Sequence, residues 1–240
     1  MNSKPRFYNI LAKIILSAED QINRDLNELS LLQSSKNLPY NFANKLPEII
    51  KKTILYKAEY LLPDYGIIYN NSIIKEPEEK DNFIIMNILP ELENLLRSIP
   101  FISCSAFIAD LDSKLQVKNI EASFIFLPIH NKIIWADKGL EQSFIENRKL
   151  KTSQVTEIER ANICNKINNN GINLNSTNHE ICMLAEAKLD VFIAKYENEL
   201  DFRAAELIAN MAGAISFIDR KDKIVKIVAN KDLLEKLKNE

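Results

Sequence analysis

The sequence predicts a layered α+β protein built from helices and β-sheets. Three observations support this class. The first third reads as helices, the middle contains a long apolar hairpin typical of an antiparallel sheet, and helices and strands alternate from Ser176 onward. With 240 residues, the chain can bury a substantial core. Its hydrophobic fraction of 46% and charged fraction of 27% are those of an ordinary globular protein.

The N-terminal segment predicts an amphipathic helix and not an export signal. Ile10 and Ile14 recur at helical spacing, and Lys13 interrupts the apolar run that a signal peptide would need. Ser3 is a candidate N-cap, and Pro5 fits the first turn. No segment has the ~20 uninterrupted apolar residues of a membrane span.

Two helices are expected in the first third, over residues 5–29 and 45–62, with the polar loop LLQSSKNLPYN between them. The middle of the chain then predicts strands, because β-branched and aromatic runs are bounded by turn residues and by the charged loop KEPEEKDN. The expected elements there are strands 67–69 and 83–88, a short helix over 91–97, hairpin strands 101–110 and 115–129, and strand 131–137.

The last third predicts alternating helices and strands. Asp201 is placed as an N-cap and Gly213 as a C-cap of one helix. The expected elements are helix 176–189, strand 190–194, helix 201–213, strands 214–219 and 223–230, and helix 231–239.

Composition excludes several kinds of site. The formal net charge of −2 gives no signal for nucleic acid or membrane binding. Only 4 glycines are present, so the chain is poorly supplied for a phosphate-cradling loop. Cys104, Cys164 and Cys182 share no close spacing, and we expect them to be reduced and buried in a cytoplasmic protein. His130 and His179 are far apart in sequence, so no His/Cys metal site is expected.

Four segments resemble motifs of the inositol monophosphatase family, in the family's order. PDYGIIYNNS resembles the segment that ends in Glu-Glu-Ser, and FLPIHNKIIWADKG resembles the Asn-Pro…Leu-Tyr-Ala-Glu-Lys-Gly hairpin. NSTNHEICMLAEAKLDVFIA is similar to the Gly-Ser-Ala-Ala helix and the Leu-Asp strand that follows it. In LDFRAAELIANMAGA, Leu200-Asp201 and Gly213-Ala214 stand for Trp-Asp and Gly-Gly. The Pro-Asp-Tyr-Gly turn is most similar to the extragenic-suppressor (SuhB-type) branch.

The resemblance implies a layered αβαβα sandwich. It implies a single domain over residues 1–240, with subdomains of about 1–150 and 151–240. Members of this family hydrolyse phosphomonoesters with a water that Mg²⁺ activates, and clustered carboxylates bind the ions. The family's ligands are the Glu-Glu pair, both aspartates of Asp-Pro-Ile/Leu-Asp-Gly-Thr, and the Trp-Asp aspartate.

Most of these carboxylates are absent from this sequence. Asn70-Asn71 replaces the Glu-Glu pair, and only Asp201 keeps its carboxylate. When ENLLRSIPF is aligned through Asn94 with the family's Thr-Asn-Phe…Pro-Phe run, four further positions are assigned. The two aspartates become Asn87 and Pro90, the glycine becomes Glu91, and the threonine becomes Leu92. An earlier Ala-Asp aspartate corresponds to Asn44.

Each of these residues has a structural and a functional interpretation. Asp201 is a helix N-cap or a surviving metal ligand. The asparagines reflect drift, or they form a hydrogen-bonding network that replaces a metal-bridged carboxylate cluster. Glu91 and Glu93 are solvated helix charges, or they rebuild a site with Asp201.

Ser176 is a helix N-cap or, together with Glu91 and Asp201, a remnant of the substrate site. Intact catalytic residues and a bound metal are not expected, and Mg²⁺ is expected only if the protein is an active phosphatase.

We therefore expect a catalytically degenerate member of the family that binds a protein partner. The resemblance to the SuhB-type branch implies the transcription antitermination machinery. The alternatives are a weak Mg²⁺-dependent phosphomonoesterase acting on inositol phosphate or a similar small phosphate, and a purely structural subunit. A basic patch around Arg148, Lys149 and Lys151 would favour a macromolecular partner. The hairpin over 102–127 predicts a buried helix layer and a homodimer contact.

Overall fold

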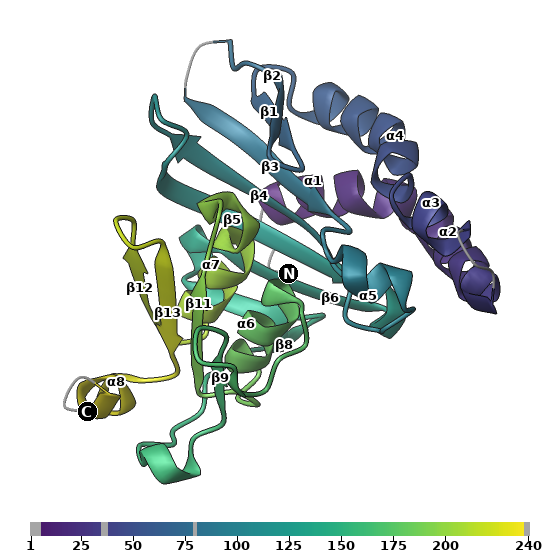
Figure 1. The fold of residues 1–240 in the computed structure, drawn as a ribbon. Helices are drawn as coiled ribbons and strands as arrows, with labels where there is room; N and C mark the ends of the chain where they lie inside the picture. The colour runs from purple at the N-terminus through teal and green to yellow at the C-terminus, as the bar shows by residue number, and fades with distance from the viewer. Residues whose placement is uncertain (1–5, 35–37, 79–80, 238–240) are drawn as a thin grey trace.

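A computed structural model shows two β-sheets and three layers of helices, stacked in the order αβαβα (Figure 1). The structure describes residues 6–34, 38–78 and 81–237. The candidate cap Ser3 and Pro5 lie outside the described residues. None of the helices in the described part of the chain is long and apolar enough to cross a bilayer.

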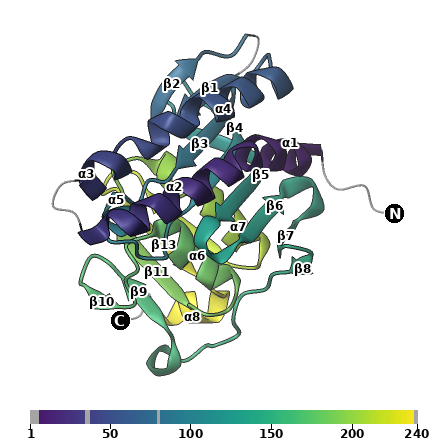
Figure 2. The same cartoon turned by 90° about the vertical axis from the view of Figure 1, so that its right-hand side faces the viewer.

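The first helical layer covers one face of the larger sheet. In Figure 2, α1, α2 and α4 lie in front of this sheet. The helices of the N-terminal part are α1 (Arg6–Ile15), η1 (Leu16–Ala18), α2 (Glu19–Leu31), η2 (Leu32–Ser34), α3 (Leu38–Ala43) and α4 (Leu46–Leu61).

The larger sheet has eight strands in the order β2-β1-β3-β4-β5-β6-β7-β8. Its strands and the short helices between them are β1 (Gly66–Tyr69), β2 (Ser72–Lys75), β3 (Asn82–Ile88), α5 (Leu92–Leu96), β4 (Cys104–Leu111), β5 (Val117–Leu127), η3 (Pro128–His130), β6 (Lys132–Asp137), η4 (Lys138–Leu140), β7 (Gln142–Ile145) and β8 (Arg148–Lys149). The predicted hairpin is confirmed by the antiparallel pairing of β4 with β5.

The central strands β3, β4 and β5 of the larger sheet are buried on both faces along most of their length because most of their residues are apolar. In β5, Phe124 and Phe126 pack with the α1–α2–α4 layer, while Ile125 and Leu127 pack on the opposite side. That opposite side meets α6 (Thr177–Ala185) and α7 (Arg203–Met211), which confirms the buried helix layer expected next to the hairpin.

The second sheet has five strands in the order β10-β9-β11-β13-β12. The remaining elements are η5 (Ile158–Arg160), β9 (Ile163–Asn165), β10 (Asn170–Gly171), β11 (Val191–Lys195), η6 (Glu199–Asp201), β12 (Ile215–Asp219), β13 (Ile224–Val228) and α8 (Lys231–Leu237). Leu233 of α8 packs on Val191 and Val228 and forms the last layer. The strands of the larger sheet precede residue 150 and those of the smaller sheet follow it, while the division into subdomains stays a prediction.

Several predicted boundaries are wrong for local reasons. The first helix is interrupted at η1, where the Ser17 hydroxyl donates to the Ile14 carbonyl at 2.6 Å and competes with the helical hydrogen-bond pattern. A helix, α3, lies within the predicted loop. The helix predicted over 176–189 ends at Ala185, because Ala187 adopts a left-handed φ of 61°.

Two predictions about helix ends also have definite outcomes. Ser176 is confirmed as the N-cap of α6, since its side chain accepts the His179 N–H. The prediction that Asp201 caps α7 is wrong, because the chain forms the short helix η6 first and Phe202 takes the N-cap position. Gly213, with φ of 110°, follows the C-cap Ala212, so the C-cap of α7 comes one residue earlier than predicted.

Candidate functional site

The structure brings the sequence-predicted metal-ligand positions together around one pocket of about 230 Å³. Its walls come from the α3–α4 junction, the β1–β2 turn, the end of β3 with the loop that follows, and η6. The lining residues are Ala43, Asn44, Pro47, Asn70, Asn71, Asn87, Leu89, Pro90, Leu92 and Asp201. The pocket therefore combines segments that are up to 158 positions apart, from Ala43 to Asp201 (201 − 43).

Asn70 and Asn71 form the two-residue turn of a hairpin between β1 and β2. Tyr69 pairs with Ser72, and the φ angles of Asn70 and Asn71 are 44° and 64°. A tight hairpin turn favours positive φ at both central positions, which asparagine tolerates better than most residues. The backbone therefore favours asparagine here, independently of any ligand. Strand β2 was missing from the sequence prediction, although paired turn residues between two apolar runs are a hairpin signal.

The side chain of Asn70 is fixed by two hydrogen bonds to one residue of β3. Its Oδ1 accepts from the Ile88 N–H at 2.7 Å, and its Nδ2 donates to the Ile88 carbonyl at 3.2 Å. Because one partner is a donor and the other an acceptor, only one orientation of the amide satisfies both. A carboxylate could accept the first bond but could not donate the second.

Asn87 and Asn71 link β3 and the β1–β2 turn to η6. Asn87, only 3% exposed, donates from Nδ2 to the Leu200 carbonyl at 2.9 Å. Asn71 donates from Nδ2 to Asp201 Oδ1 at 2.8 Å. The three amides Asn70, Asn71 and Asn87 thus act as hydrogen-bond donors at positions where the family resemblance leads us to expect anionic acceptors.

Asp201 is the one carboxylate among the described residues that line the pocket. Its pKa is raised from the usual value, because burial penalises the charged form more than the Asn71 hydrogen bond stabilises it. Asn44 is exposed, and its Nδ2 donates to the Tyr40 carbonyl of the preceding turn at 2.8 Å. No second negative charge lies opposite Asp201 along the described walls.

The loop between β3 and α5 closes the remaining side with apolar groups. Leu89 has a left-handed φ of 50°, which is rare for leucine, and its N–H donates to the Ser103 carbonyl at 2.9 Å. Pro90 has no side-chain ligand and no backbone N–H, and the Leu92 N–H is taken by the Pro90 carbonyl. This loop presents no backbone N–H from Pro90 or Leu92 to a phosphate.

Glu91 does not line this pocket. It is 8% exposed, and its carboxylate accepts the Ser103 N–H at 2.9 Å, the Ser103 hydroxyl at 2.7 Å and the Ser176 hydroxyl at 2.7 Å. The expectation that Glu91 is a solvated helix charge is therefore wrong, whereas Glu93 is exposed as expected. Burial raises the pKa of Glu91 despite these three donors.

The Glu91 network includes residues that the sequence did not single out. Asn178 Nδ2 donates to the Ser103 hydroxyl at 2.9 Å, and Ser176 Oγ lies 2.9 Å from His179 Nδ1. Because the Ser176 hydroxyl proton points to Glu91, the His179 Nδ1–H is the donor in that contact. No motif marks Ser103, and His179 is recognisable only as the third residue after the N-cap. Glu91 and Ser176 thus form a closed, buried cluster, apart from Asp201.

The side chains around the pocket do not form a ligand set for Mg²⁺. This ion takes oxygen ligands at close octahedral range, and carboxylates supply most of its charge balance. Here one carboxylate is available, and an amide N–H points at it. Among the described residues, no three His, Cys, Asp or Glu side chains are grouped so that they could bind a metal ion.

Comparison with known proteins identifies the fold. The sequence matches no family model and no curated protein. Solved structures, however, match along nearly the whole chain. The extragenic suppressor protein SuhB from Bartonella henselae has a TM-score of 0.81 at 17% identity, covering 98% of each chain. The chain has the inositol monophosphatase fold. The inositol monophosphatase from Anabaena gives a TM-score of 0.75 at 12% identity, covering 97% of this chain and 95% of that one.

A protein from Pyrococcus horikoshii with similarities to inositol-1 monophosphatase matches with a TM-score of 0.72 at 20% identity, covering 95% of each chain. These similarities confirm the predicted α+β sandwich with the inositol monophosphatase topology. At such identities they establish the fold alone.

Proposed function

We propose that this protein is a catalytically degenerate member of the inositol monophosphatase fold that acts by binding a partner. One observation carries the proposal: the buried Asn87 amide donates to the Leu200 carbonyl. The family resemblance assigns a metal-binding aspartate to this position. Asn70 and Asn71 donate in the same way, to the Ile88 carbonyl and to Asp201. The amides therefore connect the walls of the pocket directly, which is the work that a bridging cation does between carboxylates.

Electrostatics favours losing the metal-binding carboxylates of the family together with the metal. If the carboxylates stayed without a metal, they would repel one another in a partly buried cleft. With Asn70, Asn71 and Asn87 neutral, Asp201 is the one remaining anion on the described walls, and it is stabilised by the Asn71 N–H. The described walls thus carry no cluster of negative charges that needs a cation for balance, and we expect no metal cofactor.

Steady-state release of phosphate from inositol monophosphate with Mg²⁺ tests the proposal, with an active family member as positive control. We expect no turnover above background. Phosphoryl transfer depends on positioning and on electrostatic stabilisation by metal ions, and loss of one well-placed group costs about 10²–10³ in rate. Metal-dependent turnover at about a thousandth of the control rate would contradict the proposal.

Isothermal titration with Mg²⁺ and Mn²⁺ provides an independent measurement. We expect no binding in the millimolar range, because Asp201 alone cannot balance a divalent charge. Saturable binding that disappears in Asp201→Asn would show that a ligand set has formed around this carboxylate.

For the partner, we propose the transcription antitermination machinery, by analogy with the extragenic suppressor branch of this fold. The matching Bartonella henselae protein is an extragenic suppressor. Arg148, Lys149 and Lys151 are exposed at the edge of the larger sheet and form no ion pair with a described residue, so they are available to a macromolecule. The test is biolayer interferometry with purified bacterial RNA polymerase and antitermination factors. Absence of binding to each would remove this partner class.

The alternative function is a weak Mg²⁺-dependent phosphomonoesterase for inositol phosphate or a similar small phosphate. The retained Asp201 carboxylate and the open pocket beside it favour this alternative. The phosphate-release assay distinguishes the two. We also propose a homodimer, which light scattering at tens of micromolar tests, since a strict monomer would exclude it.

A further inference from the structure

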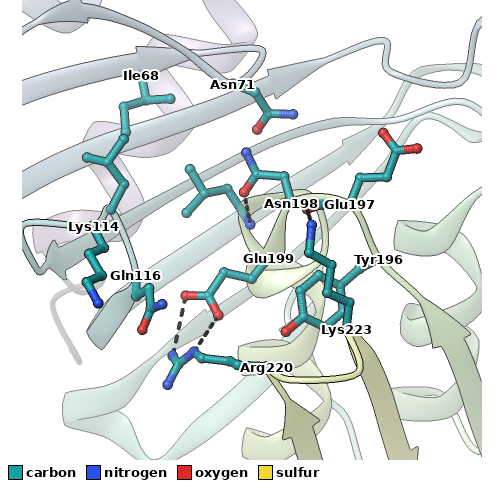
Figure 3. A pocket seen from close by; sticks show the side chains of 12 residues that line it. Ile68, Asn71, Lys114, Gln116, Tyr196, Glu197, Asn198, Glu199, Arg220 and Lys223 are labelled. Atoms are coloured by element: carbon teal, nitrogen blue, oxygen red, sulfur yellow. Dashed lines mark hydrogen bonds and ion pairs between the residues drawn. The ribbon is translucent and has the colours of Figure 1, made fainter.

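A second pocket, of about 380 Å³, adjoins the degenerate site and is formed by loops from both sheets (Figure 3). The β4–β5 turn contributes Lys114 and Gln116, the segment after β11 contributes residues 196–200, and the β12–β13 turn contributes Arg220 and Lys223. Asn71 lines both pockets. None of the lining residues belongs to the Glu91–Ser176 cluster, and Asp201, the third residue of the predicted substrate-site remnant, lines the other pocket and not this one.

An ion pair between the exposed Arg220 guanidinium and the buried Glu199 carboxylate holds the basic end of the pocket. Glu199 accepts the Val117 N–H at 2.6 Å, and Arg220 Nε donates to Glu199 Oε2 at 3.0 Å. Arg220 Nη2 donates to the Val117 carbonyl at 3.2 Å. These bonds use Nε and Nη2 of the guanidinium, so Nη1 stays available to a ligand, and the planar group is already held in place.

Two lysines add positive charge to the pocket lining. Lys114 and Lys223 are exposed, and neither forms an ion pair with a described residue. Lys223 Nζ donates only to the Glu197 carbonyl, at 3.4 Å. Figure 3 shows Lys114, Gln116 and Arg220 gathered at one end, with the Glu197 carboxylate at the opposite end. Lys114 and Arg220 bring two positive charges to the first end against the one negative charge of Glu199, so an anionic group is favoured there and repelled by Glu197 at the second end.

The opposite end offers uncharged hydrogen-bonding groups and one acceptor carboxylate. Asn198 Oδ1 accepts the Leu200 N–H at 3.0 Å, which leaves its Nδ2 as a donor. Asn71 Nδ2 is committed to Asp201, which leaves its Oδ1 as an acceptor. Together with the Glu197 carboxylate, these groups match hydroxyls, which both donate and accept.

We propose that this pocket binds a hydroxylated organic anion, with its phosphate or carboxylate between Lys114 and Arg220 and its hydroxyls toward Asn71, Asn198 and Glu197. The proposal goes beyond the binding function proposed above, because it assigns a small-molecule site to a different pocket. Asn71 joins the two pockets, so a ligand that accepts from or donates to Asn71 also affects its hydrogen bond to Asp201.

Calorimetric titration at low ionic strength tests the site with four probes: glucose 6-phosphate, gluconate, inorganic phosphate and uncharged glucose. We expect at least one of the two hydroxylated anions to bind, glucose to show no binding, and inorganic phosphate to bind more weakly because it does not reach the far end. Gluconate binding without glucose 6-phosphate binding would assign a carboxylate, and the reverse would assign a phosphate. Absence of binding by both hydroxylated anions, or equal binding of glucose, would overturn the proposal.

Paired lysine variants locate the binding. In Lys114→Ala/Lys223→Ala we expect about tenfold weaker binding, because the variant loses the charge-assisted contact from Lys114 and a second positive charge of the pocket, that of Lys223. The matched control is Lys118→Ala/Lys221→Ala, which removes two exposed lysines from the neighbouring strand and the same turn but outside the pocket lining. We expect the control to bind within about twofold of wild type. Equal affinity in the two double variants would overturn the assignment.

The outcome is independent of the proposed pseudophosphatase function. Measured turnover of inositol monophosphate would refute the degenerate-site proposal without affecting this pocket, and absence of anion binding would refute this pocket without restoring catalysis.

Discussion

Substitution of Asn87 by aspartate tests whether the amides of the degenerate site have become structural. The two side chains have nearly the same shape, so the change replaces one hydrogen-bond donor by an oxygen and leaves the packing intact. Asn87 is 3% exposed, and its Nδ2 lies 2.9 Å from the Leu200 carbonyl. In Asn87→Asp, an anionic oxygen would face that carbonyl at hydrogen-bond distance.

The expected loss of stability comes from two sources. The Leu200 carbonyl loses its partner, and an unsatisfied buried polar group costs about 1–3 kcal/mol. The introduced carboxyl must also be buried charged or be protonated, and burial raises carboxyl pKa values. We expect a total of about 2–4 kcal/mol near neutral pH, a large share of the roughly 5–15 kcal/mol by which native proteins are stable.

The pH dependence has a definite sign. A carboxyl whose pKa is raised in the folded state destabilises the protein least below its unfolded pKa of about 3.9, where it is protonated in both states. The destabilisation grows as the pH rises towards the folded pKa and is complete above it. When protonated, the introduced group can donate to the Leu200 carbonyl again. The stability difference between Asn87→Asp and wild type should therefore be smaller at pH 4 than at pH 7.5.

Urea denaturation of both proteins at these two pH values measures the effect. The matched control is Asn173→Asp, because Asn173 is exposed and its Oδ1 accepts the Asn175 N–H, which aspartate can also accept. We expect the control to change stability by less than about 0.5 kcal/mol. If Asn87→Asp is as stable as wild type at pH 7.5, or if Mg²⁺ stabilises it, the reasoning is refuted and the site is still arranged for a cation.

Three further outcomes are expected. Burial next to His130 and Lys132 lowers the pKa of His179 to about 4, so the stability of the folded protein should fall as the pH drops from about 6.5. In urea denaturation, wild type should lose about 2 kcal/mol more than His179→Gln between pH 7 and pH 5. Equal losses in the two proteins would contradict this. Glu91→Ala should lower the free energy of unfolding by about 3 kcal/mol, because it leaves the Ser103 and Ser176 donors without their acceptor. The exposed Glu93→Ala should lower it by less than about 0.5 kcal/mol. Equal shifts of the melting temperature in the two variants would contradict the buried network. Asn70→Glu/Asn87→Asp should release no phosphate above background, because Pro90 still supplies no side-chain ligand and no backbone N–H. Turnover in this double variant would show that the site does not need a ligand at position 90.

The order of helices and strands was predictable because it depends on short-range patterns. The apolar runs of β3, β4 and β5 are long enough to identify strands that are buried on both faces. Ser176 was recognised as an N-cap because capping needs only neighbouring residues. Strand β2 was missed because it is short and mostly exposed, and because it forms by pairing with β1.

The candidate site was predicted as a set of positions, through resemblance of motifs, and the structure brings the predicted metal-ligand positions among them around one pocket. What each residue does there was not predictable. Asp201 has the residue type of an N-cap, but the geometry of η6 directs its carboxylate to the Asn71 amide. Glu91 has the pattern of a solvated helix charge, but Ser103 and Ser176 reach it from other parts of the chain.

The sequence by itself therefore determined the fold class, most strands and helices, and the loss of the carboxylates, because these depend on residue type and local spacing. Only the tertiary structure decided that the Asn87 amide donates to a carbonyl 113 residues away, that Glu91 is buried, and that a basic pocket forms beside Asn71. Hydrogen bonds between distant segments depend on how the two sheets pack around α6 and α7, and no pattern of neighbouring residues determines which distant segments come within hydrogen-bond distance.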